Sequence, residues 1–531
     1  MRVLSGYFKA VVLITLRRLL PQKLYVKFTE QLGREANLDL SVTQTKQLAM
    51  YSGASLVGLD RLVSRLFEAY YSGGDPNNIV PADDIAQVAS FVPYYRGFTS
   101  VVLYNFFKSN YGIRDPILYR ISIFHGRNVV WCRQVLLPAD TAFNIQDPAL
   151  TVSSLPEHGT LAIQAFHPRI SSIPTKELRY FGIYRDLKHG IVAGVHSLGL
   201  SREKLPRLTQ PAYRGFGCCD SLYFHYSASK NRIPLISGEG DSVGMLRKLH
   251  SNTGVNSHGC MVRESPSGCP TTIWHDGPFH RDVSAVDAVK KGGAICAAFF
   301  IPDFKVHAPL ILISRNEIGF LSRWILIHLM TEGGVPIASK RVAIDSSNAT
   351  VDLKGEFFSQ NLAGSINVII EFDREIHEFK SQPTSYVHLY YRSPQGLGDQ
   401  VHSHSTLGYY EDPFRQPRSY RCRKFAPFLG DPQLEFIYSI INLGPGARPL
   451  HDNSIRLRIF TDAGAEFVVD RKLNVAGITN IRGTELFASL AVDAISVAVV
   501  QFEHETTSFN GSWFALDRVS GHLGVDHFTG G

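Results

Sequence analysis

Short runs of apolar residues alternate with clusters of glycine, proline, asparagine and aspartate from about Tyr104 to the end of the chain. Runs of this length, rich in aromatic and β-branched residues and bounded by turn-forming residues, predict β-strands. The earlier pattern differs, because Ser55 to Tyr71 places its apolar residues at helical spacing. We therefore expect a helical N-terminal region followed by β-structure.

Three kinds of strand recur along the β-rich part. An apolar strand ending in phenylalanine occurs at 159–166, 364–372 and 494–502. An aromatic-led strand closing on Arg185, Arg392 or Arg518 occurs at 180–185, 386–392 and 513–518. Upstream, a strand that opens with arginine and ends in a glycine turn occurs at 120–126, 323–334 and 456–464. The order and spacing of these runs predict three diverged copies of one β-rich unit.

Each copy offers several short antiparallel strands, and each of its sheets must bury one face. Two sheets packed face to face satisfy this requirement. The chain is therefore predicted to be mainly β, built from tandem antiparallel β-sandwich modules. The expected divisions are a helical N-terminal region at 1–102, sandwich repeat 1 at 103–200, an insertion or degenerate domain at 201–308, repeat 2 with a basic tail at 309–425, and repeat 3 at 426–531.

Composition narrows the class of protein. The 531 residues are 44% hydrophobic and 19% charged, which is a globular balance and excludes a disordered chain. The formal charge of +7 permits an anionic partner without requiring one. The seven cysteines are irregularly spaced and form no CxxC pair, so we expect a reducing compartment and a cytoplasmic location.

The first residues carry an apolar run interrupted by arginines. Residues 8–24 fit a basic amphipathic helix and fall short of the roughly 20 apolar residues that a spanning helix needs. Such a helix packs on the protein or lies on an anionic membrane surface, so a peripheral membrane contact stays open.

Side chains able to bind metal follow the arginine-ended strand in every copy. They are His196 in the first, His402 and His404 in the second, and Asp526 and His527 in the third. If the three modules packed around a pseudo-threefold axis, these side chains would converge on a site suited to zinc or iron. Alternatively, each polar residue caps its own hairpin.

A basic stretch follows the second copy. Its cations and aromatic rings suit an anionic glycan, a lipid head group or a single-stranded nucleic acid, through bidentate bonding and stacking. An anionic glycan is the preferred partner, and nucleic acid is not expected. The alternative is a linker whose arginines pair with nearby acids. The candidate ligand-binding residues are Arg415, Arg418, Tyr420, Arg421, Arg423 and Lys424.

Two further motifs lie between the first and second copies. Residues 240–244 match G-x-S-x-G and make Ser242 a candidate nucleophile, although the surroundings are not those of an alternating β/α sheet. The stretch that includes Cys260, Cys269 and His275 holds ligand-type residues without an established zinc spacing.

No motif specifies a reaction, so three hypotheses remain. The first is a non-catalytic binding or assembly protein that contacts an anionic glycan or cell-surface polymer, where repeated modules give avidity. The second is a metal- or histidine-dependent hydrolase, whose site includes either His196 and His402 at the hairpin ends or Ser242 in the 237–280 segment. The third is a structural subunit that associates through exposed sheet edges.

Overall fold

The computed structural model describes residues 87–111, 117–125, 128–147, 154–166, 178, 180–199, 221–225, 259–276, 294–314, 323–344, 348–375, 387–394, 396–402, 404–405, 422–444, 448–449, 454–474, 477–488, 495–504 and 509–530. The helical N-terminal region predicted at 1–102 lies outside these residues as far as residue 86. From residue 87 the prediction is wrong, because residues 87–95 and 99–104 form strands. The amphipathic helix predicted over residues 8–24 lies outside the described residues. Within the described ranges, no helix has the length and apolar character needed to cross a membrane.

The first sandwich pairs a five-stranded sheet, β4-β3-β6-β1-β9, with a four-stranded sheet, β5-β2-β7-β8. Its short helix α5 spans Phe107–Tyr111. Its strands are β1 Gln87–Tyr95, β2 Thr99–Tyr104, β3 Ile117–His125, β4 Asn128–Leu137, β5 Ala142–Ile145, β6 His158–Phe166, β7 Tyr180–Asp186, β8 Ile191–His196 and β9 Leu198–Gly199.

The second sandwich pairs a five-stranded sheet, β16-β15-β18-β13-β21, with a four-stranded sheet, β17-β14-β19-β20. Its helical turns are α8 Phe304–His307, α9 Leu353–Glu356 and η3 Phe358–Gln360. Its strands are β13 Ala294–Ile301, β14 Leu310–Ser314, β15 Trp324–Thr331, β16 Pro336–Ala343, β17 Asn348–Asp352, β18 Ile366–Glu375, β19 Val387–Ser393, β20 Gly396–His402 and β21 His404–Ser405.

The third sandwich pairs a five-stranded sheet, β27-β26-β29-β22-β32, with a four-stranded sheet, β28-β23-β30-β31. It adds a two-stranded sheet, β24-β25, and helix α10 Gly483–Ala488. Its strands are β22 Cys422–Leu429, β23 Leu434–Ile441, β24 Leu443–Gly444, β25 Arg448–Pro449, β26 Ser454–Thr461, β27 Glu466–Lys472, β28 Ile478–Arg482, β29 Val497–His504, β30 Asn510–Asp517, β31 Leu523–His527 and β32 Thr529–Gly530.

A separate three-stranded sheet joins the first and second sandwiches. Its strands are β10 Ser221–His225, β11 Gly259–Glu264 and β12 Pro270–Asp276, in the order β10-β11-β12. These strands belong to the segment that was expected to be an insertion.

The prediction of a mainly β chain with antiparallel sheets is confirmed, and the strand order is the same in all three sheet pairs. The recurring runs in the sequence fall in strands that hold the same places in these pairs: β3, β15 and β26; β6, β18 and β29; β7, β19 and β30. Each sheet pair also contains an earlier strand that those runs did not reveal, namely β1, β13 or β22. These strands begin before the divisions expected at residues 103, 309 and 426.

The two sheets of each pair pack face to face and are bridged by a buried tyrosine. The Tyr184 hydroxyl in β7 donates to the Pro93 carbonyl in β1 at 2.7 Å. The Tyr391 hydroxyl makes the same contact to Phe300 at 2.7 Å, and the Tyr438 hydroxyl donates to Pro427 at 2.9 Å. A buried hydroxyl needs a partner, so each bond fixes the spacing of the sheets.

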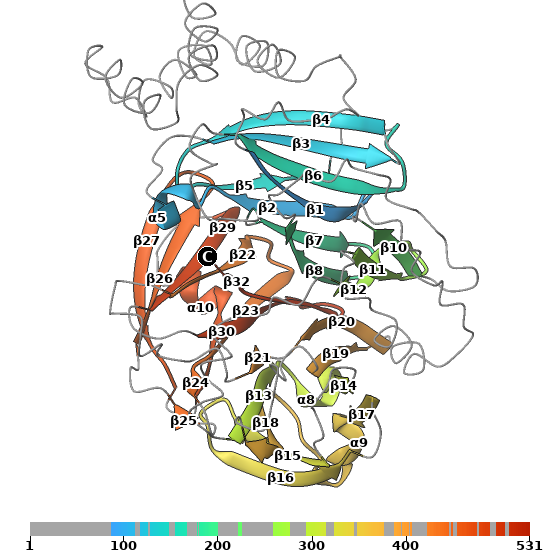
Figure 1. Cartoon of the computed structure of the whole chain (residues 1–531), viewed down its shortest axis with the longest axis vertical. Coiled ribbons are helices and arrows are strands. Elements are labelled where there is room, and N and C mark those ends of the chain that lie inside the picture. Colours follow the sequence, from blue (N-terminus) through green and yellow to red (C-terminus); the bar gives the residue numbers. More distant parts are fainter. Residues whose placement is uncertain are drawn as a thin grey trace, which may run out of the picture.

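The third sandwich lies between the first and the second, so the order in space differs from the order in the chain (Figure 1). One apolar core joins the first and third sandwiches, and the other joins the second and third. In β30, Trp513 packs edge-on against Phe181 of the first sandwich at 6.0 Å between ring centroids. The next residue, Phe514, packs against Phe300 of the second at 5.6 Å.

Strands at the junctions are buried on both faces, whereas outer strands are not. β7, β19 and β30 are buried at almost every position, so they lack the alternation of a half-exposed strand. In β15, by contrast, Ile325, Ile327 and Leu329 are buried and the residues between them are partly exposed. The difference arises because β7, β19 and β30 pack between sandwiches.

Candidate functional site

The last long strand of each sandwich runs to the place where the sandwiches meet. These strands are β8, β20 and β31, and each ends at a histidine. Each histidine pairs with a residue of the preceding strand: Phe181 with His196, His388 with His402, and Ser512 with His527. The sequence left open whether Asp526 or His527 corresponds to His196, and His527 holds the same place as His196 at the end of its strand.

Two of these histidines converge on one carboxylate. Nδ1 of His196 lies 2.8 Å from Oδ2 of Asp526, and Nδ1 of His527 lies 2.9 Å from Oδ1. The two imidazole rings meet edge to face, with 4.2 Å between their centroids. His196 and Asp526 are 330 positions apart in the chain, so the cluster exists only because the first and third sandwiches pack together.

The backbone holds the carboxylate in place. The His196 amide donates to Oδ2 of Asp526, and the His527 amide donates to Oδ1 at 2.7 Å. Asp526 is buried, and burial alone would raise the pKa of its carboxyl group. The charges and hydrogen bonds of His196 and His527 outweigh burial and hold this pKa well below its usual value.

This arrangement can bind an ion or orient two imidazoles. His196, Asp526 and His527 each offer a ligand atom, and these atoms lie within 4.8 Å of one another. The imidazole side chains keep 16% and 20% of their surface exposed, so solvent reaches the edge of the cluster. The structure therefore brings together three of the five metal-binding residues that the sequence suggested: His196, Asp526 and His527. His402 and His404 lie in β20 and β21, and their side chains are outside those described.

A second buried carboxyl group, that of Asp399 in β20, lies where all three sandwiches meet the inserted sheet. Its Oδ2 accepts from the amides of Gly194 at 2.7 Å and Val525 at 3.1 Å. Its Oδ1 accepts from the amides of Ile273 and Gln400, both at 3.0 Å. Burial raises the pKa of Asp399 to about 8, although the four N–H donors act in the opposite direction.

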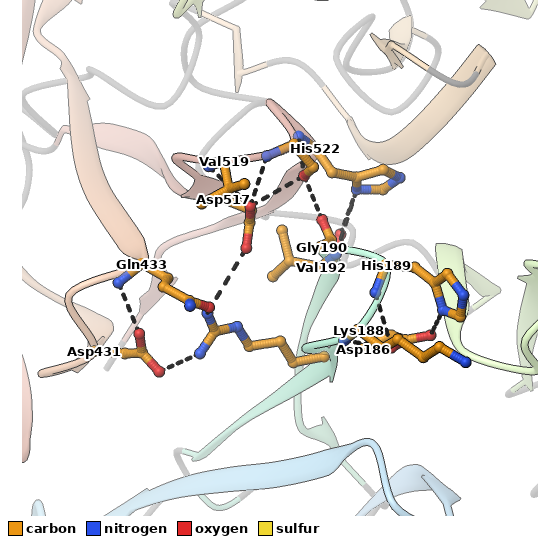
Figure 2. A network of polar contacts seen from close by, with 12 residues as sticks. Asp186, Lys188, His189, Gly190, Val192, Asp431, Gln433, Asp517, Val519 and His522 are labelled. Atoms are coloured by element: carbon orange, nitrogen blue, oxygen red, sulfur yellow. Dashed lines mark hydrogen bonds and ion pairs between the residues drawn. The ribbon is translucent and has the colours of Figure 1, made fainter.

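The turn that ends β7 contacts the third sandwich through ions and hydrogen bonds (Figure 2). The Arg185 guanidinium bonds to Asp431 and lies 3.7 Å from Oδ2 of the buried Asp517. It also donates to the side chain of Gln433 at 3.1 Å. The second recurring arginine, Arg392, forms a bidentate pair with Asp352 inside the second sandwich, at 2.9 and 2.8 Å.

Two buried histidines link further strands at these junctions. Nδ1 of His522 lies 3.1 Å from the Val192 carbonyl of the first sandwich. Nε2 of His307 in the second sandwich lies 2.8 Å from the Gly521 carbonyl of the third. Burial lowers the pKa of His522 to about 4 and lowers the pKa of His307 as well. Both imidazoles are therefore neutral near pH 7.

The basic stretch is described only at its end. Arg423 and Lys424 lie in β22, and Arg423 forms an ion pair with Glu503 at 3.3 Å. Glu503 also pairs with Arg458 at 3.0 Å. Arg423 therefore takes part in a network within the third sandwich. The other candidates, Arg415, Arg418, Tyr420 and Arg421, lie outside the described residues.

The remaining sequence candidates gain no support as a site. Ser242 lies outside the described residues. Cys269 is buried at the start of β12, where its thiol donates weakly to the Pro270 carbonyl at 3.6 Å. Burial raises the pKa of this thiol, which disfavours the thiolate that a metal or a nucleophile requires. The Cys260 and His275 side chains are not among those described.

Sequence reasoning missed the polar groups that join the sandwiches: Asp399, Asp517, His307 and His522. Asp399 follows the short motif Gly396-Leu397-Gly398, whose glycines gave only a turn signal. Three of its four hydrogen-bond donors come from outside the second sandwich, and a local sequence pattern does not reveal such partners.

No protein-family model matches the chain, and comparison with curated proteins returns no matching sequence. The geometry of the described residues is therefore the basis on which its function is proposed.

Proposed function

We propose that this chain is a non-catalytic binding and assembly protein that holds three β-sandwiches in one arrangement and presents their outer surfaces to an anionic polymer. One observation carries the proposal: polar groups at the junctions bond one sandwich to another. Asp399, Arg185 and His522 all act in this way. Hydrogen bonds buried between the sandwiches hold them in a fixed arrangement. The outer surfaces of the sandwiches are then presented at a fixed spacing.

We also infer that the three sandwiches descend from one duplicated module. Their strand order is the same, and the bridging tyrosines connect the two sheets in each. Duplication of a sandwich gives the chain several similar surfaces. When these surfaces are held at fixed positions and bind the same polymer, the overall affinity exceeds that of any one surface. This favours a repetitive ligand, such as a polysaccharide, over a single small molecule.

The ligand class follows from charge. The chain carries a formal charge of +7, and the 415–424 stretch concentrates arginines with aromatic residues. Guanidinium groups bind sulfate, carboxylate and phosphate bidentately, whereas neutral sugars offer no such partner. An anionic glycan therefore fits better than a neutral one.

Binding to an immobilised sulfated polysaccharide, with neutral dextran as comparison, tests this proposal. The wild-type chain should bind the sulfated polymer, and binding should weaken as salt rises. The combined change Arg415→Gln, Arg418→Gln and Arg421→Gln should weaken binding by about tenfold or more, equivalent to about 1.4 kcal/mol.

A charge-matched control removes three exposed cations elsewhere: Lys340→Gln, Arg341→Gln and Lys472→Gln. This control should bind like the wild type. Equal losses in both triple variants, or no binding by the wild type, would exclude the 415–424 stretch as the contact. Turnover of a simple ester or glycoside by the purified chain would overturn the non-catalytic part of the proposal.

A hydrolase is the second candidate, favoured by the partial exposure of His196 and His527 beside Asp526. Such an enzyme would use a metal-bound water as its nucleophile. Activity that disappears in His196→Ala and His527→Ala variants, with folding retained, would establish it.

A structural subunit is the third candidate, favoured by apolar residues on outer edge strands. Val130 in β4, Ile337 in β16 and Val468 in β27 are 39%, 38% and 51% exposed. Charged neighbours such as Lys340 and Asp470 oppose edge-to-edge pairing. Light scattering at rising concentration decides: a constant monomer mass excludes this role, and growing particles support it.

A further inference from the structure

We propose that His196, Asp526 and His527 bind one divalent transition-metal ion of the zinc type, which links the first and third sandwiches. This inference goes beyond polymer binding and does not depend on it. The ion would act at the junction between sandwiches, whereas the proposed polymer contact is the 415–424 stretch.

The donor set points to this class of ion. Two imidazoles and one carboxylate are ligands that zinc, iron and cobalt accept, whereas magnesium and calcium favour all-oxygen sites. Three protein ligands also leave a coordination position for water. The partly exposed imidazole edges allow an ion and its water to enter.

The distances are close to those of a coordinated ion. Nδ1 of His196 lies 2.8 Å from Oδ2 of Asp526, and Nδ1 of His527 lies 2.9 Å from Oδ1, so a carboxylate that binds the ion through one oxygen uses one of these two contacts. With metal–ligand bonds of about 2.0–2.1 Å, such a contact subtends about 90° at the ion. A tetrahedral angle needs these atoms to separate by roughly a further 0.5 Å, a shift that small side-chain rotations can supply.

The carboxylate is already fixed as a ligand. Each oxygen of Asp526 accepts from one backbone amide, of His196 or of His527. These two bonds stay in place when the imidazole nitrogens change from hydrogen-bond donors to metal ligands. Each imidazole is then neutral, with its proton on Nε2 and the Nδ1 lone pair directed at the ion.

The ligands come from two sandwiches, and the two imidazole rings lie 4.2 Å apart between centroids. Because His196 comes from β8 and the other two ligands from β31, a bound ion must stabilise the packing of the first sandwich on the third.

The test uses the full-length chain without an affinity tag, stripped with a chelator and titrated with Zn²⁺ or Co²⁺. Elemental analysis after gel filtration should find about one zinc per chain above any background from other sites. Co²⁺ should give the visible absorption of a low-symmetry site with nitrogen ligands. Zn²⁺ should raise the thermal unfolding midpoint of the stripped protein.

Two variants and one matched control assign the ion to this cluster. Asp526→Asn retains the side-chain size, and His527→Ala removes one ligand. Both should weaken binding by more than the roughly 10- to 100-fold that loss of an outer-shell partner costs. His189→Ala is the control, because His189 also pairs with a carboxylate, Asp186 at 2.6 Å, and lies outside the three-residue cluster.

The outcomes separate clearly. Loss of the ion and of its thermal shift in both variants, with retention in His189→Ala, supports the site. A wild-type chain that takes up no stoichiometric Zn²⁺ or Co²⁺ overturns the proposal without any appeal to variants. Unchanged binding in Asp526→Asn and His527→Ala overturns it too, and places the ion elsewhere. None of these results changes the outcome of the polymer-binding test.

Discussion

The Gly194 amide donates a 2.7 Å hydrogen bond to the Asp399 carboxyl group, although the two residues are 205 positions apart in different sandwiches. The bond requires β8 and β20 to approach closely, while the absence of a side chain at Gly194 leaves room for Trp513 of the third sandwich. A Cβ placed on Gly194 would lie 2.3 Å from the Trp513 ring of the third sandwich. Gly194 therefore lies at a point where all three sandwiches touch.

Gly194→Ala should destabilise the whole chain. The added methyl group forces the buried Trp513 ring to move, and overpacking of this kind costs about 1–3 kcal/mol. The thermal unfolding midpoint measures the effect. Gly333→Ala is the control, because its nearest contact would be an ordinary 3.7 Å. Equal midpoints for Gly194→Ala and the wild type would show that the ring has room to shift.

Asp399 should make stability fall as pH rises. Its folded pKa of about 8 lies above the unfolded value of about 3.9, so the native state retains a proton that the unfolded chain has released. Between these values each pH unit removes about 1.4 kcal/mol of stability relative to a non-titrating variant. Chemical unfolding from pH 5 to pH 9 should show that the free energy of unfolding of the wild type falls relative to that of the Asp399→Asn variant.

The control for this pH profile is Asp470→Asn. Asp470 is exposed and its pKa is lowered, mainly by the Arg456 hydrogen bond, so it does not titrate in this range. The difference in the free energy of unfolding between Asp470→Asn and the wild type should stay constant from pH 5 to pH 9. A level difference for Asp399→Asn as well would mean that the four N–H donors keep Asp399 ionised throughout.

Arg185→Ala should weaken the junction between the first and third sandwiches. The change leaves the buried Asp517 without its nearby cation, and breaking such a pair costs about 3–5 kcal/mol. Arg456→Ala breaks an exposed, solvent-screened pair with Asp470 and should cost much less. Chemical unfolding of both variants decides. A loss in Arg185→Ala as small as that in the control would mean that Gln433 and solvent satisfy Asp431 and Asp517.

His522 should make stability fall as pH decreases below neutrality. Its folded pKa of about 4 lies below the unfolded value of about 6.5, so the unfolded chain takes up a proton first. The cost is about 1.4 kcal/mol per pH unit between those values. His522→Asn removes the titration while its amide can still donate to the Val192 carbonyl. Unfolding curves from pH 7 to pH 4.5 should therefore be flatter for the variant.

Exposed His189 provides the comparison, because it is 47% exposed and outside the junction core. A His189→Asn variant should follow the wild-type profile. If His522→Asn also follows it, protonation of His522 does not limit the acid stability of the chain.

The strands could be predicted well because their signal is local. Runs such as residues 159–166 and 180–185 carry apolar residues and are followed by turn-forming residues, and they form β6 and β7. β1, β13 and β22 carry no recurring motif, so the expected divisions fell after them. The sequence also did not predict which sandwich lies in the middle, because the order of the modules along the chain does not specify how they pack.

The candidate site could be predicted in part for the same reason. His196, Asp526 and His527 stand at the ends of matching strands, so their positions in the sequence predicted that they meet if the modules pack around a common axis. Asp399 had no such signal, since the amides of Gly194, Ile273 and Val525 that bind it can come from any residue type.

The sequence by itself determined the mainly β character of the chain and the three related runs, because side-chain periodicity and turn residues act over a few positions. Only the tertiary structure decided which polar groups are buried together. Asp399 gains its donors where the three sandwiches and the inserted sheet meet, and Asp526 gains His196 where the third sandwich packs on the first. Hydrogen bonds and burial depend on distances in space, and two residues 330 positions apart acquire such a distance only in the folded chain.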